Sequence, residues 1–89
     1  DQEALKQDVM ARMKRIEGQV RGIQRMIEEG KECEDILVQV RAVRSALRSA
    51  TAQIMRRFRM RCQEQSATTG DPVAQYEKLV KLISDFIDG

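Results

Sequence analysis

The sequence predicts an all-α fold of three helices, in which two long antiparallel helices form a hairpin that pairs with a second copy. Apolar residues recur in steps of three and four along three separate segments, and no segment shows the alternation of a strand. The segment from Cys33 to Cys62 contains neither glycine nor proline. With 89 residues the chain forms one domain, residues 1–89, too small to cover so long a helix alone. We therefore expect two hairpins to complete a four-helix bundle.

The first helix is predicted over residues 4–29, with residues 1–4 frayed. Gly30 is a natural residue to end it, because glycine readily adopts the left-handed conformation that closes many helices. The apolar stripe consists of Leu5, Val9, Met13, Ile16, Val20, Ile23 and Ile27.

The second helix is predicted over residues 33–65, followed by a polar loop over residues 66–70. The third is predicted over residues 72–87, with Asp71 as its N-cap and Pro72 at its first position. The apolar residues of the second helix form one predicted seam: Ile36, Val40, Val43, Leu47, Ala50, Ile54 and Phe58.

The only two cysteines, Cys33 and Cys62, lie at the two ends of this seam. A separation of 29 residues corresponds to about 43 Å of helix, so the two thiols of one helix cannot meet. If two copies cross antiparallel near Leu47, Cys33 of one copy comes close to Cys62 of the other. Two-fold symmetry then gives two such pairs in each homodimer.

The charge distribution predicts a polyanionic partner, most simply DNA or RNA. Between Ile36 and Gln63 there are seven arginines and no acidic residue, although the net charge of the whole chain is only +2. The alternative is a solvated basic face without a partner. We expect Arg12 and Arg48 to contribute most to DNA binding. The full set of candidate contacts is Arg12, Lys14, Arg15, Arg44 and Arg48.

The composition argues against an enzyme, because the chain has no histidine and no glycine-rich phosphate loop. The sequence contains no signal peptide and no apolar run long enough to cross a membrane, so we expect a cytoplasmic protein without a resident cofactor. Two nearby thiols can undergo reversible sulfur chemistry or bind a thiophilic metal. They can also be small apolar residues of a core.

Four segments together resemble the copper-sensitive operon repressor (CsoR) family, over roughly residues 9–82. These segments are Arg15-Ile-Glu-Gly-Gln-Val-Arg-Gly-Ile, Met26-Ile-Glu-Glu-Gly, Cys33-Glu-Asp-Ile-Leu and Val43-Arg-Ser-Ala-Leu. The resemblance implies a dimer of hairpins that assembles into a tetramer, a dimer of dimers. It also implies binding of operator DNA through basic surfaces of the first two helices, without a helix-turn-helix.

Within that family, the resemblance is closest to the persulfide-sensing branch, which has the two cysteines and lacks the metal-binding histidine. Copper sensors of the family have a histidine four residues before the second cysteine, where this chain has Phe58. They often have a tyrosine where it has Glu32. The resemblance thus implies a repressor with no metal ligands beyond the two thiols.

The implied signal is a low-molecular-weight persulfide or polysulfide. We expect the thiolate of Cys33 to react with it first, since helix N-termini favour reactive cysteines. Cys62 of the second copy then resolves the product to a di-, tri- or tetrasulfide, and the operator DNA is released. One alternative is a repressor that senses Cu(I) or another thiophilic metal. A second is a helical interaction module that binds an acidic protein or a membrane surface instead of DNA.

Overall fold

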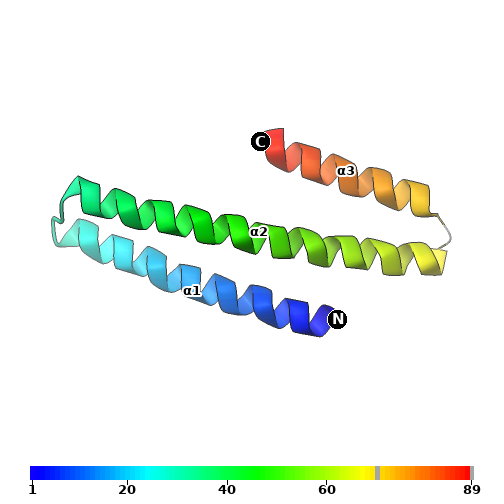
Figure 1. Cartoon of the computed structure of the whole chain (residues 1–89), viewed down its shortest axis with the longest axis horizontal. Coiled ribbons are helices and arrows are strands. Elements are labelled where there is room, and N and C mark those ends of the chain that lie inside the picture. Colours follow the sequence, from blue (N-terminus) through cyan, green and yellow to red (C-terminus); the bar gives the residue numbers. More distant parts are fainter. Residues whose placement is uncertain (70, 89) are drawn as a thin grey trace.

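The computed structural model describes residues 1–69 and 71–88 and contains three helices (Figure 1). The side chains of residues 62, 65–69 and 72 are outside the described part. Helix α1 spans Gln2–Glu28, α2 spans Cys33–Thr69 and α3 spans Pro72–Asp88. No strand occurs in the described residues, so the predicted all-α class is confirmed.

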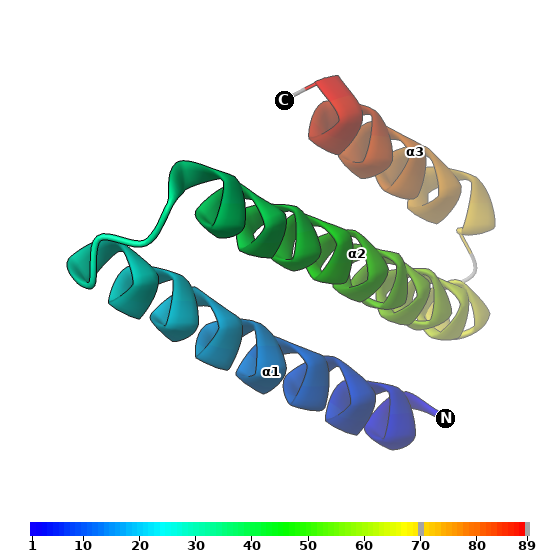
Figure 2. The ribbon, with the colours of Figure 1, turned by 60° about the vertical axis from the view of Figure 1, so that its left-hand side comes forward.

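Helix α2 is the central element of the molecule. Helix α1 runs antiparallel along one side of it, and α3 folds back along its C-terminal half (Figures 1 and 2). Among the described residues α1 and α3 make no contact with each other. The side-chain amide of Gln2 donates a hydrogen bond of 3.2 Å to the carbonyl of Arg57, which fixes the start of α1 against α2.

Both ends of α1 are capped. The carboxylate of Asp1 accepts hydrogen bonds from the backbone amides of Glu3 and Ala4, at 2.7 and 3.0 Å. The prediction of a frayed start at residues 1–4 is therefore wrong, because an N-cap aspartate satisfies amides that a frayed end would leave to water.

At the other end of α1, Gly30 has a φ of 68°, in the left-handed region, as predicted. The amide of Gly30 donates to the carbonyl of Ile27, and the amide of Lys31 donates to that of Met26. These two bonds form a Schellman motif, which turns the chain into the hairpin. The helix ends at Glu28, one residue before the predicted end.

Helix α2 continues to Thr69, four residues beyond the predicted end at 65. Residues 66–69 are serine, alanine and two threonines; alanine favours a helix and the others are not breakers, so no residue stops the helix before Gly70 and Pro72. Helix α3 starts where predicted, and the carboxylate of Asp71 accepts a bond of 3.1 Å from the amide of Ala74. It ends at Asp88, one residue later than predicted.

The single chain is elongated and has almost no core of its own. Its dimensions are 57 × 29 × 14 Å and its radius of gyration is 17.5 Å, whereas a compact domain of this length has about 12 Å. The buried apolar residues of the described part are Leu5, Ile16 and Ala50. So small a core favours assembly with further copies. None of the described helices has the length and apolar character needed to span a membrane.

Candidate functional site

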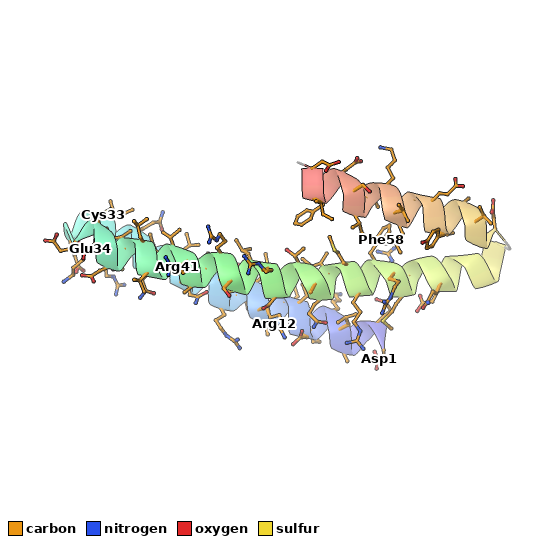
Figure 3. All side chains as sticks on the ribbon, turned by 45° about the horizontal axis from the view of Figure 1, so that its top comes forward. Asp1, Arg12, Cys33, Glu34, Arg41 and Phe58 are labelled. Carbon is orange, nitrogen blue, oxygen red and sulfur yellow. The ribbon has the colours of Figure 1, made fainter. Side chains whose placement is uncertain are left out.

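Cys33 is the first residue of α2 and is exposed to solvent. It lies at the end of the hairpin where α1 turns into α2, far along α2 from Phe58 (Figure 3). The carbonyl of Glu32 accepts hydrogen bonds of 3.1 Å from the amides of Asp35 and Ile36, which begin the first turn around the cysteine. The thiol is thus held on a regular helix start and is accessible to a small reagent.

Cys62 belongs to the same continuous helix, and its side chain lies outside the described part. Because no break separates it from Cys33, the two positions are about 43 Å apart along the helix axis. A contact between them within one chain is excluded by this geometry. Their approach to each other across two copies stays a prediction.

A stripe of α2 residues spaced seven apart leads away from Cys33 along the helix. Val40, Leu47 and Ile54 belong to it, and they are 41%, 41% and 46% exposed. A repeat of seven residues keeps one face of a helix toward a neighbouring helix. Helix α1 carries a matching exposed pair, Val20 and Ile27. These faces are what a second hairpin would cover in a four-helix bundle.

Phe58 lies on the same side of α2 as this stripe, four residues after Ile54, as the predicted seam requires, but α3 covers the seam at this end. It is half-buried and lines an apolar pocket of about 160 Å³ between α2 and α3. The pocket residues are Ile54, Met55, Phe58, Leu79, Leu82 and Ile83. The position that the resemblance assigns to a copper-binding histidine is therefore occupied by a side chain that packs against α3.

The backbone of Cys62 lies one turn after Phe58 on α2. A separation of four residues places two positions on the same face of a helix. Position 62 is therefore on the side of α2 that faces α3. The sequence did not indicate that α3 lies beside position 62, because the spacing of apolar residues in α2 does not show which helix packs against them.

The five candidate DNA contacts fall into two groups. Arg12 is only partly exposed (34% for its side chain), and its Nε donates to the carboxylate of Asp8 at 2.8 Å. It also lines a groove together with Gln53, Arg56 and Met60 of α2. Arg12 therefore faces α2 more than solvent.

The other four candidates are exposed and form no ion pair in the described part of the chain. They are Lys14 and Arg15 on α1, and Arg44 and Arg48 on α2. Two further arginines of α1, Arg21 and Arg25, are equally exposed and were not among the candidates. Their spacing from Lys14, at seven and eleven residues, is the sequence signal that could have found them.

The chain offers few side chains that could bind a metal ion. Among the described side chains there is no group of three or more His, Cys, Asp or Glu residues that could hold a metal ion. The sequence has no histidine at all, so any site would depend on thiolates and carboxylates.

Comparison with known families gives a match to the family of metal-sensitive transcriptional repressors over residues 5–85. The copper-sensing transcriptional repressor RicR of Mycobacterium tuberculosis is 45% identical over 69 residues, which cover 78% of this chain and 72% of RicR. The copper-sensing transcriptional repressor CsoR of Bacillus subtilis is 36% identical over 81 residues, which cover 91% of this chain and 80% of that protein.

Two solved structures have a similar fold. The copper-sensing repressor CsoR with Cu(I) from Geobacillus thermodenitrificans matches with a TM-score of 0.80 and 38% identity, over 91% of this chain and 84% of the other. The nickel-responsive transcriptional regulator InrS matches with a TM-score of 0.76 and 31% identity, over 90% of each chain.

Proposed function

The chain belongs to the family of metal-sensitive transcriptional repressors, and from this membership we propose that it is a DNA-binding repressor whose signal is a reactive sulfur species. The sensing groups are Cys33 of one subunit and Cys62 of another. The observation that carries this proposal is that position 58 holds a phenylalanine and not a histidine. Phe58 packs against α3 and cannot ligate a metal, while the exposed Cys33 keeps its thiol available for chemistry.

Metal sensing by a copper site with a histidine ligand does not fit these residues. Phe58 offers no donor atom, and no histidine exists elsewhere in the sequence to replace it. The two thiols alone suffice for sulfur exchange, in which one is attacked and the other resolves the product.

The reaction balances with a hydropersulfide, RSSH, as the oxidant. The Cys33 thiolate attacks the outer sulfur of RSSH, the S–S bond breaks, RS⁻ leaves and Cys33 carries a persulfide. The Cys62 thiolate of the second subunit then attacks the inner sulfur of that persulfide and expels HS⁻, which leaves an inter-subunit disulfide. A second persulfide that adds one sulfur before this step gives a trisulfide. The bridge fixes one packing of the two hairpins and so shifts the population away from the DNA-binding arrangement.

The pairing is tested with single-cysteine variants under anaerobic conditions. Reduced protein is treated with a glutathione persulfide donor, and its intact mass is measured without reductant. We expect a covalent dimer from the wild type, heavier by about 32 Da for each additional sulfur. Neither Cys33→Ser nor Cys62→Ser alone should give a covalent dimer.

Co-expression of the two variants with different tags supplies the decisive sample. A heterodimer of Cys33→Ser and Cys62→Ser chains retains one intact pair, so it should become cross-linked and lose DNA binding. Covalent dimers of the Cys62→Ser variant alone would contradict the pairing, because they require two Cys33 thiols to meet.

Sensing of Cu(I) through the two thiolates is the second candidate, and the copper-sensing relatives favour it. Thiolates are soft ligands that suit Cu(I). An anaerobic Cu(I) titration against a competing chelator, followed by a DNA-binding assay, separates the two signals. An affinity no tighter than that of a simple dithiol, with DNA still bound, contradicts copper sensing.

DNA binding itself is tested at Arg48, which is exposed on α2 and free of ion pairs in the described part. Arg48→Glu should weaken binding to a duplex of the promoter region upstream of the protein's own gene. The slope of log K against log salt should become shallower by about 1 for each phosphate that the variant no longer neutralises. An unchanged affinity and slope would remove Arg48 from the interface.

A further inference from the structure

Leu37 is an exposed apolar residue near the start of α2, one turn after Cys33. Its exposed fraction is 58%. Leu37 and Met55 are 18 residues apart, which is five full turns, so both project from the same side of α2. At Met55 this side is covered by α3, but α3 folds back only along the C-terminal half of α2 and does not reach Leu37 (Figure 1). Within its own chain Leu37 thus lacks the cover that α3 gives to Met55.

The apolar pocket between α2 and α3 complements this exposed side chain. All the side chains that line it are apolar, and its volume is about 160 Å³. An apolar cavity of about 150 Å³ can hold a guest the size of benzene, so the pocket has room for the isobutyl group of a leucine. Leu82 of α3 lines the pocket and is exposed, and Phe86, one turn further on, is exposed as well. The apolar surface of the pocket therefore continues onto an exposed face of α3.

The proposed pairing of two copies determines the level at which Leu37 meets the second chain. Cys33 and Cys62 are 14 residues before and 15 residues after Leu47. Leu37 and Phe58 are 10 residues before and 11 residues after it, which is the same offset. An antiparallel pair of α2 helices that brings Cys33 to Cys62 therefore also brings Leu37 to Phe58, which lines the pocket.

The symmetry of such a pair also determines the side on which they meet. A two-fold axis between two antiparallel α2 helices keeps both α3 helices on the same face of the pair. The C-terminal half of one α2, with its α3, then lies beside the N-terminal half of the other. Because Leu37 projects from the α3 side of α2, it points toward α3 of the second copy. Val38 is equally exposed, at 60%, but it is turned by 100° around the helix and points away from that α3.

We propose that Leu37 of one copy docks in the apolar pocket between α2 and α3 of the second copy, and that this contact holds the two cysteine-bearing turns together. Leu37 is one turn after Cys33, and Phe58 is one turn before Cys62, so a contact between them fixes both turns. Leu37 is then a positioning residue, which acts through the distance between the two thiols. The inference rests on the proposed function and names the contact that makes its cysteine pair reactive.

Docking is tested by cross-linking in the whole chain, in which Cys33→Ser and Cys62→Ser remove the native thiols. Leu37→Cys and Leu82→Cys are introduced together, and the protein is oxidised with diamide. Positions 37 and 58 of one α2 are about 32 Å apart, so a disulfide between positions 37 and 82 forms only between two copies. We expect a covalent dimer on a non-reducing gel. Val38→Cys with Leu82→Cys is the matched control and should give at most about a tenth of the yield.

The effect on sulfur chemistry is measured with Leu37→Ala, and Val38→Ala is the control. Intact mass after addition of a glutathione persulfide donor gives two rates, persulfide formation on Cys33 in a Cys62→Ser background and bridge formation with both cysteines present. Leu37→Ala should change the first rate by less than about twofold and slow the second by about tenfold. Val38→Ala should change neither rate. Circular dichroism and sedimentation velocity check the fold and the assembly of each variant.

Three outcomes overturn the inference. The first is a cross-link from position 37 to position 82 that is absent or no stronger than the one from position 38. The second is bridge formation at the wild-type rate in Leu37→Ala, and the third is an equal slowing of both steps, which would mean that Leu37 acts on Cys33 itself. If a persulfide forms no bridge in the wild type, the proposed function fails, and the cross-link between positions 37 and 82 still decides whether Leu37 docks in the pocket.

Discussion

Phe58 of α2 and Leu79 of α3 line the same apolar pocket, so the residue at the position of the copper-binding histidine is part of the contact that holds α3 against α2. A histidine ligand needs a ring nitrogen directed at a metal, whereas Phe58 offers only apolar surface to its neighbours. A phenylalanine instead of a histidine at position 58 therefore changes both the chemistry and the packing of this turn of α2. It places the contact with α3 one turn before position 62 of α2.

We predict that Phe58→Ala weakens the attachment of α3. Truncation of a fully buried phenylalanine costs about 3–5 kcal/mol, and truncation of a half-buried one correspondingly about 1–2 kcal/mol. Urea unfolding at fixed protein concentration measures the free energy of unfolding, and limited proteolysis reports on α3. Phe58→Leu is the matched control and should lose less than half as much. If wild type, Phe58→Ala and Phe58→Leu had equal free energies of unfolding, the contact between Phe58 and α3 would contribute nothing to stability.

We predict that Phe58→His creates a tighter Cu(I) site. The change supplies the ligand that the resemblance places four residues before the second cysteine. It would be one turn from Cys62 and, in the proposed pairing, close to Cys33 of the second copy. Anaerobic competition with a Cu(I) chelator should give an affinity at least about tenfold above wild type, or about 1.4 kcal/mol. The gain should disappear in a Phe58→His, Cys62→Ser double variant. A wild-type affinity in the single variant would mean that position 58 does not face the thiols.

The helices and their ends were largely readable from the sequence, because each rests on local physical chemistry. The periodicity, the glycine at Gly30 and the Asp71-Pro72 start act within a few residues of chain and need no tertiary partner. The start of α1 was misjudged because one aspartate, Asp1, decides whether it frays. The end of α2 was misjudged because a polar segment without a helix breaker was taken for a loop.

The element that covers each part of the apolar side of α2 was not readable from the sequence. Spacing places Leu47 and Phe58 on one broad apolar side, but it does not say which element covers each of them. The structure leaves Leu47 exposed and covers Phe58 with α3. The pairing of Arg12 with Asp8 was readable from their spacing of four residues within one helix. That Arg12 lines a groove with residues of α2 was not readable.

We predict that Leu47→Glu breaks the assembly of hairpins. Leu47 is at the centre of the exposed stripe of α2, and an antiparallel pair that crosses there would bury a carboxylate against its own copy, without a partner charge. Sedimentation velocity should show monomer, and circular dichroism should show reduced helix content, since the single chain has little core. Ser49→Glu, which adds the same charge at an exposed position off the stripe, should stay assembled. An intact oligomer in the Leu47→Glu variant would place the interface on another face.

We predict opposite effects on stability for the same change at two glycines of the α1 hairpin. Gly30 has a φ of 68°, so Gly30→Ala forces an alanine into the left-handed region, at a cost of about 1–2 kcal/mol. Gly22 is inside α1, and a Cβ atom there would meet nothing within 4 Å. Gly22→Ala should therefore stabilise the helix by up to about 1 kcal/mol, because alanine loses less backbone entropy on folding. The urea midpoints of both variants, measured at one protein concentration, show whether each change stabilises or destabilises the protein. A destabilising Gly22→Ala would indicate that a second copy approaches this face of α1 in the assembly.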